Sequence, residues 1–185
     1  KDGVVHVVWE HSDPDDPGVV RVAYRAVSRK GKPLGPAVQI SEGPFDRRPS
    51  VLALDEVVHV AFDRLVDNCP TGVADPDYDV FMRTLAGKGW GPALVVDGRD
   101  GIQAAVDMAP ARNGGVLLVY HSSHLHGLVK WWTLRRGRGR LVEQLAAVDE
   151  AAVAEPHGEQ QGAEFPALEV LPDGRALVFS RPSQG

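Results

Sequence analysis

The chain has 185 residues and a mass of 19.9 kDa, with 43% hydrophobic residues, 24% charged residues and a formal net charge of −5. These values describe an ordinary soluble globular domain and exclude a disordered chain or a basic surface for nucleic acid. The single cysteine, Cys69, excludes a disulfide framework and a multi-cysteine metal site. We expect no membrane insertion, because no run approaches roughly 18 apolar residues. Because the chain begins at Lys1, we expect a fragment or a processed product.

The local pattern favours many short strands. Glycine (20 residues) and proline (14) are spread along the chain, which suits strands joined by turns better than long helices. Four apolar runs, each rich in β-branched residues and ending near an aromatic residue, are predicted strands. They are residues 4–9, 57–62, 116–120 and 176–179.

These runs belong to an internal repeat. Residues 31–37 (GKPLGPA) recur 56 positions later as residues 87–93 (GKGWGPA). A strand that starts with proline precedes two of the apolar runs, at 49–54 and 166–171, with a tight turn between the strand and the run. Each repeat therefore predicts a four-stranded antiparallel unit. In the second repeat the strands are expected at 50–54, 57–62, 78–85 and 93–96.

Four-stranded units of this length, stacked radially, describe the blades of a β-propeller. We predict an all-β fold in which residues 1–185 form a single partial propeller domain of about three and a half blades. The blade units lie roughly at 1–42, 43–98, 99–150 and 160–185. Residues 141–155 have a helix-like composition, but we predict a strand at 141–148 because the repeat requires one there. Remaining blades, or further copies of the chain, are expected to complete the ring.

Particular residues resemble those of the sialidase-superfamily (BNR, or Asp-box) β-propellers. The segment Arg47-Arg48-Pro49-Ser50-Val51-Leu52 with its following strand is similar to the Arg-Ile-Pro hairpin of that superfamily, and residues 165–181 are similar to a second such hairpin. The Asp-boxes are degenerate, because Thr84, Gly87, Lys88 and Trp90 remain without the aspartate. The resemblance implies a glycan ligand and an extracytoplasmic or secreted protein. It does not assign the tyrosine nucleophile or its glutamate partner.

The predicted strand order brings polar residues to one rim of the ring. Loops that follow each second strand and loops that precede each first strand open on the same side, where acids, arginines and histidines converge as a polar ligand requires. We predict catalytic roles for Asp63, His121 and Glu164, with Asp63 as general acid. The predicted substrate-binding residues are Arg47, Arg48, Arg64, His124 and Arg181. The resemblance implies that Arg47 binds a substrate carboxylate. The alternative is that surface loops are polar without a role.

Metal sites receive weaker support. Residues 121–126 (HSSHLH) hold three imidazoles that could ligate zinc, but they lack the helical His-x-x-x-His spacing, and we predict no metal site there. Calcium is the one cofactor left open, through Asp67, Asp75 and Asp77, although the glycine and glutamate of an EF-hand are missing.

Three functions remain open. The first is a glycan-directed glycoside hydrolase. The second is a non-catalytic propeller scaffold that binds carbohydrate or protein. The third is a polysaccharide lyase that would use His121 or His124 together with Tyr120 or Tyr78 for proton transfer. None of them involves nucleic acid.

Overall fold

The computed structural model describes residues 3–54, 56–67, 77–87, 89–98, 102–111, 115–122, 130–134, 163–171 and 176–182. Every helix or strand in these ranges is a β-strand, so the all-β prediction is confirmed. The strands form antiparallel sheets. Within these ranges no helix has the length and apolar character needed to cross a membrane. The strand predicted at 141–148 lies outside the described residues.

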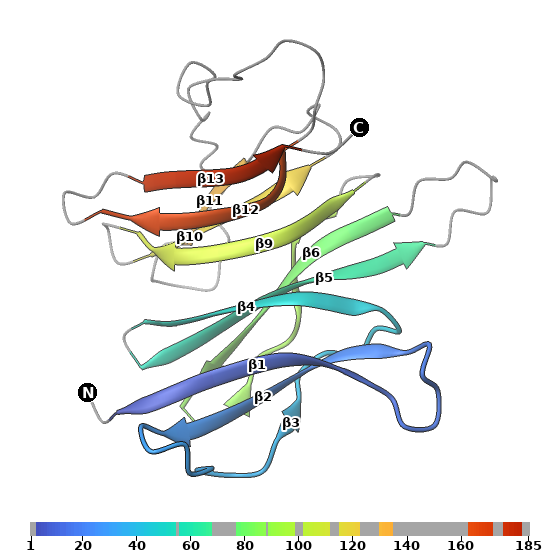
Figure 1. Ribbon diagram of the computed structural model, residues 1–185, viewed down its shortest axis with the longest axis vertical. Coiled ribbons are helices and arrows are strands. Elements are labelled where there is room, and N and C mark those ends of the chain that lie inside the picture. The colour runs from blue at the N-terminus through green and yellow to red at the C-terminus, as the bar shows by residue number, and fades with distance from the viewer. Residues whose placement is uncertain are drawn as a thin grey trace.

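The first two sheets cover the N-terminal half of the chain (Figure 1). Sheet A has the order β1-β2-β3, and its strands are Val4–Ser12, Val20–Ser28 and Val38–Gln39. Sheet B has the order β4-β5-β6-β7, and β8 also pairs with β6. Its strands are Asp46–Leu54, Val57–Asp67, Asp77–Ala86, Gly89–Trp90 and Leu94–Asp97. All four strands predicted for the second repeat are therefore confirmed. The first three are longer than predicted, the fourth is shifted by one residue, and the short strand β7 was not predicted.

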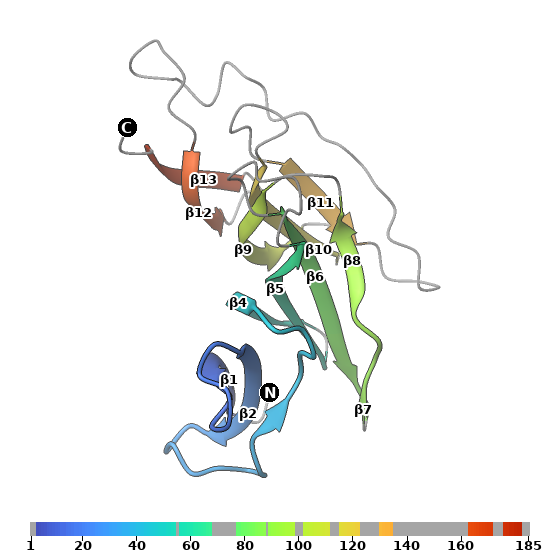
Figure 2. The same cartoon turned by 90° about the vertical axis from the view of Figure 1, so that its right-hand side faces the viewer.

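The remaining two sheets follow in chain order. Sheet C has the order β11-β10-β9, and its strands in chain order are Gln103–Pro110, Val116–Ser122 and Lys130–Leu134. Sheet D pairs β12 (Ala163–Val170) with β13 (Ala176–Pro182). Neighbouring strands in all four sheets are consecutive in the chain, except that β8 pairs with β6. Figures 1 and 2 show the sheets as successive layers, from sheet A at one end to sheet D at the other.

Sheet B packs against another sheet on each of its two faces. Because side chains alternate across a strand, neighbouring residues of its strands enter different interfaces. One face packs against sheet A. In this interface β5 contributes an apolar trio of alternate residues, which are Val58, Val60 and Phe62. Sheet A meets this trio with residues from β2 and from the end of β3, which are Val22, Tyr24 and Ile40.

The interface between sheets B and C repeats this construction. The strand β10 contributes the corresponding apolar trio, which is Val116, Leu118 and Tyr120. Sheet B meets the trio with residues of β6 and β8, which are Val80, Met82 and Val96. In each interface, therefore, one strand of the later sheet packs on the last strands of the earlier sheet.

The first strands of the sheets lie close to one another. The strand β4 contacts both β1 and β9, and β9 contacts β12, so these strands follow one another along the near side of Figure 1. The strands β4, β9 and β12 each carry one extra residue relative to their partner strand, at 48–49, 105–106 and 165–166. Such a β-bulge bends the strand and redirects its side chains.

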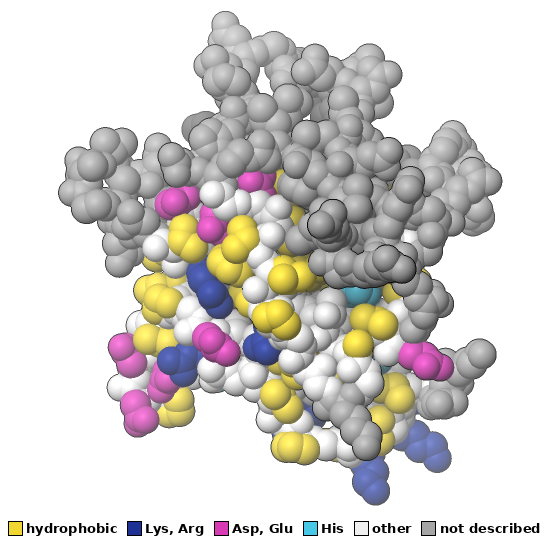
Figure 3. All heavy atoms as spheres, turned by 180° about the vertical axis from the view of Figure 1, so that it is seen from behind, with side chains coloured by type: hydrophobic (Ala, Val, Ile, Leu, Met, Phe, Trp, Pro, Cys, Tyr) yellow, Lys and Arg dark blue, Asp and Glu magenta, His cyan; other side chains and the backbone are white. Residues whose placement is uncertain are grey.

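The back of the molecule carries apolar side chains in scattered groups between charged ones (Figure 3). Exposed apolar residues occur on the outer strands of sheet B, where Leu94 is 40% and Val95 49% exposed. Scattered exposed apolar residues are normal on a folded protein.

Candidate functional site

The strand registers bring the predicted rim residues to one end of the sheets. Asp46 lies opposite Arg64 and Arg47 opposite Asp63, because the start of β4 pairs with the later part of β5. In sheet C the start of β9 meets the end of β10 in the same way. We call this the polar end.

The prediction that these residues lie in loops is wrong in detail. The strand β5 continues past Phe62 to Asp67, so Asp63 and Arg64 are part of the sheet. Arg47 and Arg48 likewise lie within β4. The ladder continues because the bulge in β4 takes up the extra residue, and pairing resumes on both sides of it.

Asp63 and Arg64, although adjacent in the sequence, do not pair with each other. Because neighbouring residues of a strand point to opposite faces, each finds a partner on β4 instead. Asp63 binds Arg48 on the face toward sheet C, and Arg64 binds Asp46 on the face toward sheet A. Two ion pairs, one on each face of the sheet, therefore join β4 and β5 at the polar end.

Asp46 is completely enclosed, and its carboxylate is fully used. Arg64 donates from Nε to Oδ1 at 2.7 Å and from Nη2 to Oδ2 at 3.1 Å, and the Gly43 amide donates to Oδ2 at 2.7 Å. The Arg64 guanidinium also lies 4.4 Å from the centre of the Phe81 ring. A side chain at Gly43 would meet Arg64 Nε and Asp46 Oδ1 at 2.5 Å, so glycine is required there. This arrangement is structural, because nothing on Asp46 is left for a ligand.

Asp63 is also fully enclosed but is held differently. Arg48 donates from Nε to Oδ2 at 2.5 Å, and the Ala105 amide of the neighbouring sheet donates to Oδ1 at 3.3 Å. The Arg48 guanidinium lies 5.5 Å from the centre of the Tyr78 ring and covers the carboxyl. Arg48 and Ala105 both have positive φ, at 49° and 56°. Backbone strain at two residues that hold the same carboxyl is typical of a functional or strongly constrained position.

The pKa of Asp63 is raised to about 6 because burial disfavours the charged carboxylate. The positive charge and the hydrogen bond of Arg48 act in the opposite direction, as does the Ala105 amide. Asp63 therefore holds a proton in mildly acidic solution, as a general acid does. Asp63 has no solvent exposure and is bound to Arg48 in this conformation, so a ligand would reach the carboxyl only after Arg48 or another neighbour moved.

We expect this pKa to make stability depend on pH in a defined direction. The unfolded chain has an Asp pKa near 3.9, so between about pH 4 and pH 6 the folded state binds more protons than the unfolded state. The free energy of unfolding should then fall as pH rises through 6, by about 3 kcal/mol for a shift of about two units. Urea titrations of the wild type and of Asp63→Asn at pH 4, 5, 6 and 7 test this expectation. The quantity compared is the difference in the free energy of unfolding between the two proteins at each pH.

Arg48→Gln supplies the matched control for that experiment. Without the guanidinium the pKa of Asp63 should rise further, and the decrease in stability should extend to higher pH. A difference between wild type and Asp63→Asn that stayed constant, or that grew with pH, would contradict the assignment.

Arg47 differs from the other two arginines of this segment. Its guanidinium lies 5.4 Å from the centre of the Phe45 ring, and its Nε is buried without a hydrogen-bond partner among the described residues. Arg48 and Arg64, by contrast, are bound to carboxylates that have no solvent exposure. Among the described residues, Arg47 is therefore the one of these three arginines without a carboxylate partner, and its guanidinium could take an anionic group.

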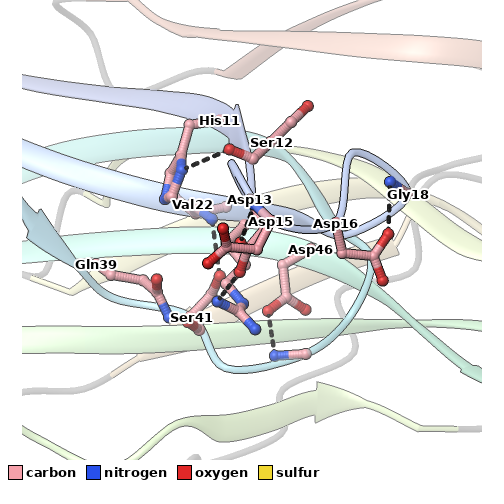
Figure 4. A network of polar contacts seen from close by, with 12 residues as sticks. His11, Ser12, Asp13, Asp15, Asp16, Gly18, Val22, Gln39, Ser41 and Asp46 are labelled. Atoms are coloured by element: carbon pink, nitrogen blue, oxygen red, sulfur yellow. Dashed lines mark hydrogen bonds and ion pairs between the residues drawn. The ribbon is translucent and has the colours of Figure 1, made fainter.

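The acids of the neighbouring loop are used within the chain (Figure 4). Asp13 accepts the Asp15 amide at 3.0 Å and Arg21 Nη1 at 2.8 Å, while Asp16 accepts the Gly18 amide at 3.0 Å. These bonds shape the turn between β1 and β2. Glu10 at the end of β1 accepts the Arg48 amide at 2.8 Å and so connects sheet A to the polar end.

The other predicted site residues are placed less completely. His121 is half-buried near the end of β10, opposite Ala104. Glu164 and Arg181 lie opposite each other in β12 and β13, in register positions like those of Arg47 and Asp63. His124 lies outside the described residues.

Tyr120, which the lyase hypothesis used for proton transfer, points into the core. It has no solvent exposure, packs between sheets B and C, and donates to Asp97 Oδ2 at 2.7 Å. This position excludes contact with a ligand at the polar end in this conformation. The lyase hypothesis therefore loses one of its two tyrosines.

Asp107, which was not among the predicted site residues, connects three sheets. It accepts Ser50 Oγ of β4 at 3.0 Å and the Leu168 amide of β12 at 2.9 Å. It also accepts the amide of Met108 at 2.8 Å. The available signal was a single acid in a strand whose other residues after Gln103 are apolar, which favours a hydrogen-bonded carboxylate.

Among the described residues, no group of three or more His, Cys, Asp and Glu side chains gathers as a metal site requires. Asp75, one of the proposed calcium ligands, lies outside the described residues. Asp67 and Asp77 face each other in the register of β5 and β6.

Comparison with models of known protein families finds no match, and a search of curated proteins finds none either. The assignment of a function therefore rests on the geometry of this chain.

Proposed function

We propose that sheets A to D are successive blades of a β-propeller and that their polar end binds an anionic glycan. Three observations support the propeller. Strands that are consecutive in the chain pair along the main path of each sheet, the A–B and B–C interfaces use corresponding strands, and the first strands of sheets B, C and D are bulged at the same place. Radial repetition of one unit produces such equivalence.

The state of Arg47 carries the proposal for the ligand. Arg48 and Arg64 are neutralised by buried carboxylates, whereas Arg47 keeps a buried Nε that no described residue binds. A guanidinium matches the two oxygens of a carboxylate, so a uronic or sialic acid suits this position better than a neutral sugar. The proposed function is therefore binding of an acidic sugar by Arg47.

Calorimetric titration with 3′-sialyllactose, a glucuronic acid oligosaccharide and lactose tests this proposal. We expect the acidic sugars to bind in preference to lactose, and Arg47→Gln to weaken their binding roughly tenfold or more, since a charged hydrogen bond is lost. Arg29→Gln is the matched control, because Arg29 is exposed beyond β2 at the opposite end of sheet A. Equal binding of lactose, or unchanged binding by Arg47→Gln, would refute the proposal.

Glycoside hydrolysis is a second candidate, favoured by one observation. Asp63 is a carboxyl whose pKa of about 6 suits a general acid. Turnover of aryl sialosides and aryl glucuronides at pH 5, lost in Asp63→Asn, would support hydrolysis. Glycan binding without turnover would leave the protein a binding propeller.

A further inference from the structure

The face of sheet A that points away from sheet B is apolar and open. The strand β1 places there a trio of alternate residues, Val5, Val7 and Trp9, opposite Val27, Arg25 and Ala23 of β2. Val5 is 46% and Val7 39% exposed, and Trp9 is half-buried. In Figures 1 and 2 sheet A lies at one end of the stack of sheets.

The corresponding residues of sheet B are buried. The trio of β5, Val58, Val60 and Phe62, is 5%, 0% and 0% exposed because it packs on sheet A. The sequences of the two strands also correspond, with residues 4–9 reading VVHVVW and residues 57–62 reading VVHVAF. The open face of sheet A therefore corresponds to the face of sheet B that is buried against sheet A.

An arginine extends this correspondence beyond the apolar residues. Val60 lies opposite Arg83 in sheet B, just as Val7 lies opposite Arg25 in sheet A. Arg83 donates from Nη1 to the Ile40 carbonyl of sheet A at 2.7 Å, and so reaches across the interface to the chain just after β3. Arg25 has a buried Nε for which the described residues provide no hydrogen-bond partner.

We infer that this face of sheet A docks another β-sheet of the same construction. That sheet would offer an apolar pair on its third strand, as Val22 with Tyr24 and Val80 with Met82 do. Its fourth strand would offer an apolar side chain and a free main-chain carbonyl for Arg25. The inference rests on the proposed blade architecture and is independent of the glycan.

A second copy of the chain fits this face less well. Packing two such faces together would bring two Arg25 side chains into one apolar interface without a carbonyl or an acid between them, which is costly. Sheet D of a second copy does not supply the required strands either, because among its described residues it consists of two strands that correspond to β4 and β5.

An extended protein tests the inference. A second copy of residues 43–111 is joined ahead of Lys1 in the full chain, so that the added β6 and β8 can cover the β1 trio and the added β9 can lie beside β1. Val7→Cys in a Cys69→Ser background reports accessibility through its rate of thiol labelling. Labelling should be rapid in the unextended protein and at least about tenfold slower in the extended one, because docking must open first.

Two controls decide between the outcomes. Met82→Asp in the added copy alone should restore rapid labelling, and the same extension placed after Gly185 should have no effect. Rapid labelling in the extended protein, whether the added segment is folded or unfolded, would overturn the inference. So would slow labelling of the unextended protein together with a dimeric mass by light scattering. Sugar binding through Arg47 is measured separately and does not depend on either result.

Discussion

Arg64→Met is expected to reduce the free energy of unfolding by about 3 to 5 kcal/mol, because it leaves the carboxylate of Asp46 buried without its counter-charge. Asp46 has no solvent exposure, and the donor that remains to it among the described residues is the amide of Gly43. Methionine keeps much of the length of the side chain that packs on Phe81, so the loss reports mainly on charge. Urea unfolding at neutral pH measures the change.

The double variant Asp46→Asn with Arg64→Met is the control. Asparagine keeps an oxygen for the Gly43 amide but carries no charge, so the double variant should regain most of the lost stability. If the double variant were as unstable as the sum of the two single variants, the two side chains would not be coupled, and the structural role given to this pair would be wrong.

Phe62→Ala should cause a loss of similar size, about 3 to 5 kcal/mol, because it removes a fully buried ring and leaves a cavity between sheets A and B. The ring of Phe62 is stacked with that of Phe81, with centroids 6.1 Å apart. The expected result is a lower urea midpoint and loss of protection from hydrogen exchange in both sheets, since the cavity lies at their interface.

Trp9→Ala is the matched variant, because Trp9 occupies the corresponding place in β1. Its ring is half-buried on the open face of sheet A, so its removal should cost clearly less than the removal of Phe62. If Trp9→Ala reduced the free energy of unfolding as much as Phe62→Ala does, the open face of sheet A would already be covered in solution.

The two buried carboxylates at the polar end have different consequences for function. Asp46 is fixed by three hydrogen bonds and supports the fold. Asp63 has a pKa raised to about 6, so its protonation changes in mildly acidic solution. It is bound to the side chain of Arg48, which is 35% exposed. Chemistry at this end would therefore require Arg48 to move, whereas binding by Arg47 would not.

The repeat and the alternation of apolar residues were sufficient to predict the all-β class and the strands of sheet B other than the two-residue β7. Alternation is a local property, since every second side chain of a strand enters the same interface. The aromatic residues Trp9, Phe62 and Tyr120 marked corresponding places in β1, β5 and β10 for the same reason. The placement of Arg47 and Asp63 at the same end of sheet B also followed from strand order, which sets which strand ends lie together.

The partners of the charged residues could not be predicted in this way. Asp63 and Arg64 are adjacent in the sequence but lie on opposite faces of β5, and a one-residue bulge in β4 decides which arginine each carboxylate meets. Burial raises the pKa of Asp63, and the groups that oppose this shift are Arg48 and the Ala105 amide of β9 in another sheet.

From the sequence alone, then, came the strands, their order and the end of the sheets at which polar residues gather, because these depend on local alternation and on turns. The tertiary structure alone decided which carboxylates are buried, which arginine stays unbound and which face of sheet A is open. Those properties depend on contacts between sheets, where the packing of one layer on the next sets burial and hydrogen bonding.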